Sequence, residues 1–222
     1  SLGIFAGRIA NFMNGELYGR PIASADSFGA SWAVKFPTEA YLWLKHDADK
    51  SISDSAPDLL PRLAEAADRA GMPASEWLNH ASHVRSSMGA RGAIQEGIQK
   101  IITATEQHNQ NVIEALQPVL TARHPYQLYG SLLEGLLLFA IALFVWRKPQ
   151  KPGVVGGIWL ISYALVRILT EHFRMPDAHI GYQLLGLTRG QWLSVAMLIA
   201  SIGVLVWALK RKTLPIGGWG KR

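Results

Sequence analysis

Apolar residues follow one another almost without interruption in three stretches of the C-terminal part, at residues 131–146, 154–169 and 192–209. A membrane helix needs about 20 mainly apolar residues to cross the hydrocarbon core, and each stretch approaches that length and can extend into its flanks. A fourth apolar run occupies residues 2–18, after which Pro21 disfavours a continued helix. The pattern therefore predicts membrane helices at both ends of the chain.

Residues 38–123 have a different pattern, since they are polar, rich in Ala, Glu, Gln and His, and apolar only at helical spacing. This spacing predicts four helices, at residues 39–45, 57–70, 75–84 and 93–120. The stretch before them has the composition of a loop, with a short strand predicted at residues 32–36. The helices are expected to form a water-exposed head between the membrane segments.

Together the two patterns predict an all-α fold: a polytopic transmembrane helix bundle with an inserted, mostly helical head, which the charges and the resemblance described below make a periplasmic head. Residues 1–21 are expected to form the end of a transmembrane helix and residues 22–123 the head. Residues 124–222 are expected to form three transmembrane helices with a cytoplasmic C-terminal tail. Because the first apolar run is already under way at Ser1, we expect further membrane helices to precede this sequence.

Composition adds a positive charge to this picture. The 222 residues include 22 Lys and Arg against 16 Asp and Glu, a formal net charge of +6. The densest basic clusters flank apolar spans, which favours membrane lipid over nucleic acid as a partner. The sequence contains no cysteine, which excludes disulfides, Cys-bound zinc and a cysteine nucleophile within it. The histidines of the head lack a supporting third ligand, so neither a metal site nor a cofactor is predicted.

The positive charges also predict an orientation. Residues 147–151 contain three Lys or Arg and the positions after residue 209 contain five, whereas residues 173–189 contain two. Because cytoplasmic loops carry the excess of Lys and Arg, the 147–151 loop and the C-terminus are expected on the cytoplasmic side. Counting spans backwards then places the head and the 173–189 connection on the outer side.

The first apolar run carries polar residues at membrane depth. If its helix continued through residue 19, one narrow face would carry a cation, an amide and two glycines, with a carboxylate at its edge: Arg8, Asn11, Gly15, Gly19 and Glu16. An arginine at such depth is costly and usually faces a bundle interior or a wet cavity. One interpretation is a structural Arg8–Glu16 ion pair, and the other is a functional site.

A second polar cluster belongs to the middle one of the three C-terminal spans. Its members share one helix face and are Tyr163, Arg167, Glu171 and Arg174. Arg167 and Glu171 are one turn apart and can pair directly, either as an interhelical salt bridge or as part of a site. Arg174 fits an interfacial cation that reaches lipid headgroups, whereas Arg167 lies deeper and fits that role poorly.

The segment His124-Pro125-Tyr126-Gln127-Leu128-Tyr129 opens the next span. His124 can titrate near neutrality and act as a base, or it can cap the following helix. Glu134, a turn further, is another carboxylate within an apolar run. Arg8 and Arg167 are expected to converge from different helices just below the outer surface. Two guanidiniums suit a phosphodiester, because each planar fork donates two parallel hydrogen bonds to phosphate oxygens.

Three segments carry a resemblance to a known family: GRIANFMNGELYGRP at residues 7–21, HPYQLY at residues 124–129, and residues 167–177. In this order they resemble the prolipoprotein diacylglyceryl transferases, bacterial inner-membrane enzymes that lipidate lipoprotein precursors. The likeness covers residues 1–21 and 123–209, and three ordered motifs of this length form a specific signal.

The resemblance implies that diacylglyceryl is transferred from phosphatidylglycerol to the lipobox cysteine thiol of a prolipoprotein, with release of glycerol phosphate. The nucleophile then arrives on the substrate, which agrees with the lack of cysteine in this sequence. The implied partners are phosphatidylglycerol, the prolipoprotein signal peptide and membrane lipid, with no nucleic acid and no cofactor. The implied location is the inner membrane, with the head and the site toward the periplasm.

The resemblance and the polar faces together predict catalytic positions at Arg8, Asn11, Glu16, Gly19, Arg167 and Glu171. They predict substrate-binding positions at Arg8, His124, Gln127, Tyr129, Tyr163 and Arg174. Arg8 is the residue expected to bind the phosphatidylglycerol headgroup. The family usually has HPSQLYE where this chain has Tyr126 and Gly130 in place of serine and glutamate. A His-Gly-Gly segment proposed to hold the catalytic base is expected in sequence that precedes this one.

Two other classes of protein fit some of these features. A transporter or channel lines a solute path with intramembrane charges, but the two halves of this sequence show no self-similarity. A non-catalytic membrane scaffold whose periplasmic head binds a partner would explain the head. That hypothesis leaves the costly burial of Arg8 and Arg167 without a purpose.

Overall fold

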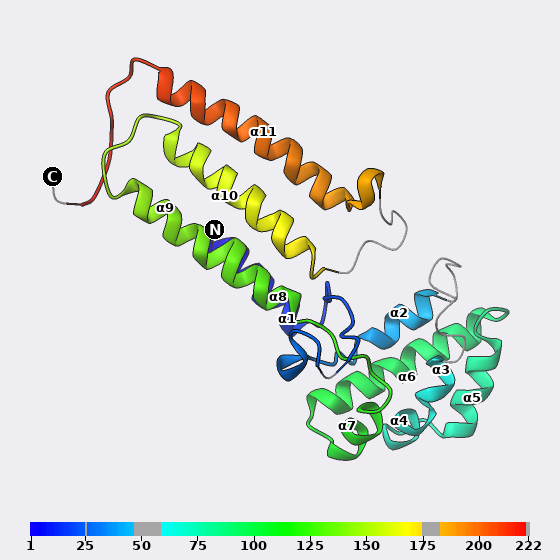
Figure 1. Ribbon diagram of the computed structural model, residues 1–222. Coiled ribbons are helices and arrows are strands. Elements are labelled where there is room, and N and C mark those ends of the chain that lie inside the picture. The colour runs from blue at the N-terminus through cyan, green and yellow to red at the C-terminus, as the bar shows by residue number, and fades with distance from the viewer. Residues whose placement is uncertain (25, 47–58, 175–182, 221–222) are drawn as a thin grey trace. The chain divides into compact units, whose positions relative to one another are not determined.

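A computed structural model (Figure 1) describes residues 1–24, 26–46, 59–174 and 183–220. The chain divides into two compact units: Ser1–Arg20 with His124–Arg222 form the first, and Pro21–Arg123 form the second. Every regular element among the described residues is a helix, and extended pairing there is limited to isolated bridges. The predicted all-α class with membrane helices is therefore confirmed.

The first unit contains three helices that are long and apolar enough to cross a membrane: Tyr126–Trp146, Val154–Glu171 (α10) and Arg189–Lys210 (α11). α10 packs against both of the others, as Figure 1 shows. Each helix contains one predicted apolar stretch and is longer than that stretch at one end or both. The three predicted spans are confirmed as helices, and the additional turns include the polar residues Gln127, Glu171 and Arg189.

The first of these spans changes its helical form along its length. It consists of α8 (Tyr126–Gly130), a π-helical segment η3 (Ser131–Leu137) and α9 (Leu138–Trp146). π segments inside α-helices are rare and are found frequently at functional sites. The apolar pattern predicted one continuous helix and did not indicate this segment, because hydrophobicity alone does not distinguish the two hydrogen-bonding patterns.

The helix α1 (Leu2–Met13) ends five residues earlier than the predicted helix of residues 2–18. Asn14 closes it, and Gly15 follows with a left-handed φ of 59°. Glycine in this conformation directly after a helix is a common termination, because it lacks the Cβ that would be strained there. The predicted helical face was therefore wrong for Gly15 and Gly19, which lie in the loop after α1 rather than in line with its arginine and asparagine.

The second unit begins with a 3-10 turn, η1 (Ala30–Trp32), and continues with six helices in its described part. These are α2 (Glu39–His46), α3 (Leu59–Arg62), α4 (Ala64–Arg69), α5 (Ala74–His83), α6 (Met88–Glu106) and α7 (Gln110–Leu116). Trp77 is fully buried at their centre and donates its indole N–H to Leu60 O at 2.8 Å. One face of α6 packs Ile94, Ile98 and Ile101 into the same core. α2 and α5 confirm two of the predicted helices.

The other two predicted helices of this unit are broken. The helix predicted at residues 93–120 is divided between α6 and α7 at His108, whose φ is 58°. Asn109 then caps α7 by accepting the N–H of Asn111 at 3.2 Å, a role that asparagine prefers to a helix interior. The side chain therefore ends one helix and starts the next although the apolar periodicity continues.

The segment predicted as a helix at residues 57–70 forms α3 and α4 in its described part, and residues 57 and 58 lie outside the described ranges. Pro61 lacks a backbone N–H, so it fits only the first turn of a helix, and α3 is accordingly short. The strand predicted at residues 32–36 is reduced to one bridge between Val34 and Arg123. A strand needs a partner along its length, and here the pairing stops after a single residue.

The two ends of the second unit are joined by a buried ion pair. Arg123 donates from Nη2 to Glu39 Oε1 at 2.6 Å, and Thr121 donates its backbone N–H to Glu39 Oε2 at 3.1 Å. Glu39 is 1% exposed and Arg123 is 6% exposed. The backbone of Arg123 also exchanges two hydrogen bonds with Val34, both at 3.0 Å. Side chain and backbone thus bring the end of this unit back to its beginning.

We expect Glu39→Gln to destabilise the second unit by about 3–5 kcal/mol, because it removes the carboxylate from a buried guanidinium. The measurement is hydrogen exchange of the α2 and α6 peptides in the complete protein, read by mass spectrometry. Glu65→Gln is the matched control, since its pair with Arg69 is exposed and worth at most about 1 kcal/mol. Equal exchange rates in the two variants would show that the buried pair contributes no more than a surface pair.

Candidate active site

A single buried carboxylate lies at the centre of the polar residues of the first unit. Glu134, on η3, is fully buried and receives a guanidinium from each of two other helices. Arg8 on α1 approaches Oε2 through Nη2 at 2.9 Å, and Arg167 on α10 approaches Oε1 through Nη1 at 3.3 Å. Thr170 donates its hydroxyl to the same Oε1 at 2.8 Å. Glu134 therefore gathers the two arginines that the sequence predicted to converge.

The π-helical segment and a glycine bring this carboxylate next to α1. η3 buries Ser131, Glu134 and Gly135 on one side. A β-carbon at Gly135 would lie 2.6 Å from Phe5 Cβ, so only glycine allows the backbone of α1 to come this close. Because the two backbones lie so close, the Arg8 side chain reaches Glu134. The local backbone of the first span is thus part of the construction of the site.

Tyr126 contacts both arginines of the cluster, Arg8 and Arg167. Its ring lies 5.3 Å from the Arg8 guanidinium carbon, which is a cation–π contact. Its hydroxyl accepts a hydrogen bond from Arg167 Nη1 and donates to Glu134 Oε1 at 3.4 Å. The tyrosine is fully buried, so its ring and hydroxyl restrict the positions of both guanidiniums. The sequence identified Tyr126 only as a difference from the family pattern, not as a site residue.

The second carboxylate, Glu171, connects α10 to the start of α11. Its Oε2 lies 2.9 Å from Arg167 Nη2, and its Oε1 lies 3.5 Å from Arg174 Nη1. Thr188, the N-cap of α11, donates its hydroxyl to Oε1 at 3.1 Å. A β-carbon at Gly190 would come within 2.6 Å of the same oxygen, so the first turn of α11 packs directly on the carboxylate. Glu171 therefore holds Arg167 from the side opposite Glu134.

The cluster combines three guanidiniums with two carboxylates. Arg8 and Arg167 meet at Glu134, and Arg167 and Arg174 meet at Glu171. The guanidinium-bearing side chains of Arg8, Arg167 and Arg174 remain 16%, 14% and 19% exposed, whereas the carboxylates are nearly inaccessible. An accessible cationic edge backed by buried anions attracts an anion, and guanidiniums match phosphate oxygens in geometry.

Glu16 and Asn11, two further predicted residues of the first motif, make their described contacts through backbone carbonyls. The side chain of Glu16 is exposed, and its carbonyl accepts the Gln127 side-chain N–H at 2.5 Å. Arg8 takes Glu134 as its carboxylate, so the proposed structural pair with Glu16 is wrong. Asn11 is half-buried and its carbonyl accepts the N–H of Glu16 at 2.9 Å. These bonds fasten the loop after α1 onto α8.

Gly19 is a close-approach glycine. A side chain there would overlap the carbonyl of His124, and the glycine pairs as an isolated bridge with Arg174. The next residue continues the contact, because His124 donates its backbone N–H to Arg20 O at 3.1 Å. The arginine Nε of Arg20 donates in turn to Arg174 O at 3.1 Å. Gly19 thus joins three segments that are far apart in the sequence at one end of the spans.

His124 and Tyr129 form a separate aromatic group beside the arginine cluster. The imidazole Nδ1 lies 3.3 Å from the Tyr129 hydroxyl, and both rings pack against Phe173 with centroid distances of 5.4 and 5.5 Å. Burial lowers the pKa of His124 below its ordinary value. The lowered pKa favours the neutral imidazole, the form that a base or a hydrogen-bond acceptor requires.

Tyr163 is a predicted site residue whose described contact is with an aromatic ring of its own helix. Its ring stacks on Trp159 at a centroid distance of 5.4 Å and an interplanar angle of 8°. Trp159 donates its indole N–H to the hydroxyl of Ser1 at 2.7 Å. Tyr163 therefore belongs to an aromatic stack on α10, one helical turn before Arg167.

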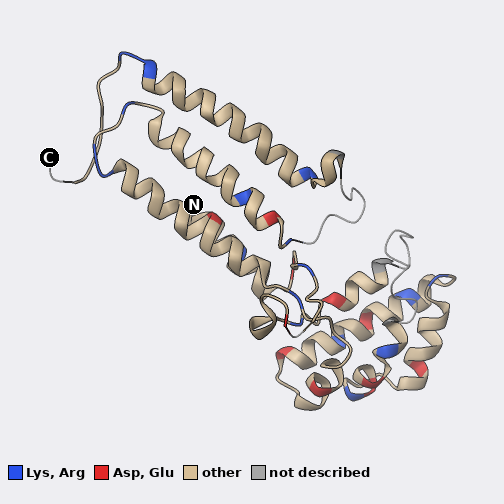
Figure 2. Ribbon diagram, in the orientation of Figure 1, with Lys and Arg blue, Asp and Glu red and all other residues tan. Residues whose placement is uncertain are grey.

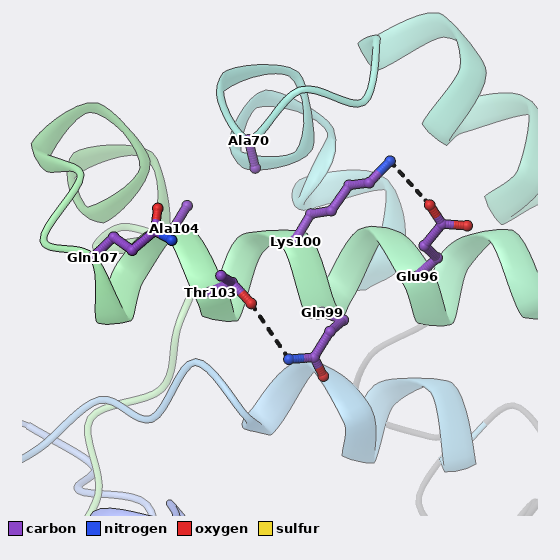
Figure 3. A pocket seen from close by; sticks show the side chains of 7 residues that line it. All are labelled: Ala70, Glu96, Gln99, Lys100, Thr103, Ala104 and Gln107. Atoms are coloured by element: carbon purple, nitrogen blue, oxygen red, sulfur yellow. Dashed lines mark hydrogen bonds and ion pairs between the residues drawn. The ribbon is translucent and has the colours of Figure 1, made fainter.

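No group of three or more His, Asp or Glu side chains in the described part of the chain is arranged to hold a metal ion. One open groove lies in the second unit (Figure 3), lined by Ala70, Glu96, Gln99, Lys100, Thr103, Ala104 and Gln107. Its polar side chains pair along α6 itself, as Lys100 does with Glu96 at 3.1 Å and Gln99 with Thr103 at 3.5 Å. The groove contains none of the predicted site residues.

The first unit therefore has the construction of a helical membrane protein with a cluster of arginines and buried carboxylates at one end of its spans. The family described as Prolipoprotein diacylglyceryl transferase matches residues 1–207. The chain belongs to this family, and the resemblance seen in its three motifs is confirmed.

Several curated relatives are named phosphatidylglycerol–prolipoprotein diacylglyceryl transferase. One from Bdellovibrio bacteriovorus is 41% identical over 218 residues, which cover 98% of this chain and 58% of the relative. One from Idiomarina loihiensis is 48% identical over 95 residues, 43% of this chain and 35% of the relative. One from Burkholderia multivorans is 33% identical over 210 residues, which cover 95% of this chain and 52% of the relative. The chain spans about half the length of the curated relatives it matches.

Proposed function

We propose that this protein transfers the diacylglyceryl group of phosphatidylglycerol to the lipobox cysteine thiol of prolipoproteins. The observation that carries the proposal is the cluster of Arg8, Arg167 and Arg174 around two buried carboxylates, in which the guanidinium side chains stay partly exposed. A phosphodiester headgroup has the charge and the oxygen geometry that such a cluster binds. The names of the curated relatives state the same activity for those proteins.

The proposed reaction is a displacement at carbon. The cysteine sulfur of the prolipoprotein attacks the glyceryl carbon that carries the phosphate, and a C–S bond forms as the C–O bond to phosphate breaks. The electron pair of the broken bond leaves with glycerol phosphate, and the thiol proton passes to a base. Negative charge that develops on the leaving oxygen is stabilised by the guanidinium N–H groups of Arg8 and Arg167, which Glu134 and Glu171 hold in place.

We assign the remaining predicted residues to binding and positioning. Arg174 lies at the polar end of α10 and suits a lipid phosphate at the interface. The His124–Tyr129 group and the buried Gln127 adjoin the loop after α1, where the signal peptide would approach. Asn11, Glu16 and Gly19 shape that loop through their backbone contacts. His124 is the candidate base of this chain for the thiol proton.

The direct test is mass spectrometry of a lipobox peptide incubated with the full-length protein in phosphatidylglycerol vesicles. We expect the peptide to gain the mass of one diacylglyceryl group and glycerol phosphate to appear in equal amount. A peptide with serine in place of the cysteine is the control and should gain nothing. An unmodified cysteine peptide, with folded protein present, would reject the transferase and leave a transporter or a scaffold.

The proposed location is a bacterial inner membrane, with the site and the second unit toward the periplasm and the C-terminal tail in the cytoplasm. This sequence contains no cysteine, so a cysteine introduced into it is the only one within these 222 residues. We expect Ser86→Cys, at an exposed position of the second unit, to react with a membrane-impermeant maleimide in intact spheroplasts. Pro215→Cys in the tail should react only after permeabilisation. The opposite labelling pattern would reverse the orientation.

A further inference from the structure

The end of the spans opposite the arginine cluster carries a second charged surface. The cations there come from the loop between α9 and α10, from the last residue of α11 and from the residues that follow it: Arg147, Lys148, Lys151, Lys210, Arg211 and Lys212. Residues 135–170 and 178–222 contain no Asp or Glu, so nothing in these stretches neutralises them. Figure 2 shows this basic end of the first unit, where α9 and α11 finish.

The tail after α11 is held against the loop by backbone pairing. Gln150 and Ile216 exchange two hydrogen bonds, at 3.1 and 2.9 Å, and Gly220 donates its N–H to Arg147 O at 2.9 Å. Lys151 donates its ammonium to the carbonyls of Leu209 and Arg211 at 2.7 and 3.0 Å, and so caps the end of α11. The tail is therefore a built part of the first unit (Figure 1).

Glycines make this pairing close. Gly217 and Gly218 have positive φ values of 75° and 89°, which other residues adopt only with strain. A β-carbon at Gly217 would lie 2.5 Å from the indole nitrogen of Trp146, and one at Gly220 would lie 2.7 Å from Arg147 O. The backbone of the tail therefore packs closely against the loop. The family match ends at residue 207, so this tail lies beyond it.

The tail exposes apolar and aromatic side chains. Leu214, Ile216 and Trp219 are 84%, 62% and 63% exposed, and Trp146 and Trp207 at the adjoining helix ends are also exposed. Three tryptophans beside six cations form the composition of a membrane interface, where indoles prefer the headgroup level. Arg211 adds a cation–π contact by lying 4.4 Å from the Trp207 ring. Apolar side chains can contact the acyl chains of a lipid, while the cations beside them can bind the anionic headgroups.

We propose that the paired tail and the 147–151 loop form a preformed docking surface for anionic phospholipid headgroups, in the leaflet opposite the candidate active site. Leu214, Ile216 and Trp219 enter the headgroup region, and the surrounding lysines and arginines bind the phosphates. This surface is separate from the Arg8 cluster and does not depend on the proposed transfer reaction.

The test compares lipid selectivity in phosphatidylcholine bilayers. The full-length protein carries Arg8→Ala, so that the candidate active site contributes less, and spin-labelled phosphatidylserine is compared with spin-labelled phosphatidylcholine. We expect the protein to select phosphatidylserine, and the triple change Lys148→Gln, Arg211→Gln and Lys212→Gln to lower that selectivity roughly two-fold or more. Each cation near an anionic surface favours binding by up to about five-fold, diluted here over all lipids that contact the spans.

The matched control removes three exposed cations from the second unit: Arg62→Gln, Arg85→Gln and Lys100→Gln. It should leave the selectivity unchanged. Gly217→Val keeps every charge but detaches the tail, and we expect it to lower the selectivity as well. Unchanged selectivity in the triple variant would overturn the proposal, and so would an equal loss in the control. Unchanged selectivity in Gly217→Val would overturn the preformed surface in favour of charge alone.

Discussion

Replacing Arg8 by lysine is expected to lower the initial rate of diacylglyceryl transfer by about 10²–10³-fold, comparable to removal of one transition-state donor. Arg8 lies over the Tyr126 ring and uses one edge of its guanidinium for Glu134 at 2.9 Å. The planar fork leaves other N–H groups for the phosphate of the lipid. Lysine keeps the charge, but it cannot hold the carboxylate and donate paired bonds to the ligand at the same time.

The measurement is the rate of transfer to a lipobox peptide in phosphatidylglycerol vesicles at equal amounts of folded protein. Arg174→Lys is the matched control, since this residue lies at the polar end of α10 and either cation reaches a headgroup from there. We expect the control to retain most of the activity. A rate near that of the unchanged protein for Arg8→Lys would mean that Arg8 acts as a point charge, and the paired phosphate contact would have to be abandoned.

Glu134→Gln is expected to have the largest effect on the first unit as a whole. The carboxylate pairs with Arg8 and Arg167 and accepts the Thr170 hydroxyl, and all of it is buried. The amide leaves two guanidiniums without their shared counter-charge, at a cost of about 3–5 kcal/mol in stability. We also expect the transfer rate per folded molecule to fall more than ten-fold, because the two arginines then repel each other and lose their common anchor.

Two measurements separate these effects: the thermal unfolding midpoint of the protein, and kcat for transfer normalised to the folded fraction. Glu39→Gln supplies a control with the same chemical change at a buried pair outside the first unit. It should destabilise the second unit while the rate per folded molecule stays close to normal. If Glu134→Gln kept both the midpoint and kcat, the shared carboxylate would have no part in organising the site.

Much of the membrane architecture was predictable from the sequence because the bilayer imposes a simple rule on each segment. Long apolar stretches must become helices there, since a helix satisfies its own backbone hydrogen bonds. The three predicted spans and the helical character of the second unit followed from this rule and from periodicity. The boundaries followed less well: α1 stops at Met13 and the helix predicted at 93–120 is divided at His108. Both breaks depend on single residues with left-handed backbone or capping side chains nearby.

Part of the candidate site was also visible before the fold. Arg8 and Arg167 stood out because a charge in an apolar run is costly, and the pairing of Arg167 with Glu171 followed from their spacing of one helical turn. Glu134 carried the same signal, a carboxylate in an apolar run, but it was not assigned to the site. Tyr126 gave no such signal, since a tyrosine near the end of a span is ordinary at a membrane interface.

By itself, the sequence determined the class of protein, its family and the number of spans among the described residues. It also identified the charged residues whose burial in a membrane costs so much free energy that a role is expected for them. Only the tertiary structure decided how those residues combine. Arg8 and Glu134 are 126 positions apart and Arg167 and Glu134 are 33 apart. Their meeting depends on the π-helical segment and on the packing of α1 against Gly135. Helical spacing relates residues within one helix, whereas the choice among distant carboxylates is made by which backbones can approach each other most closely.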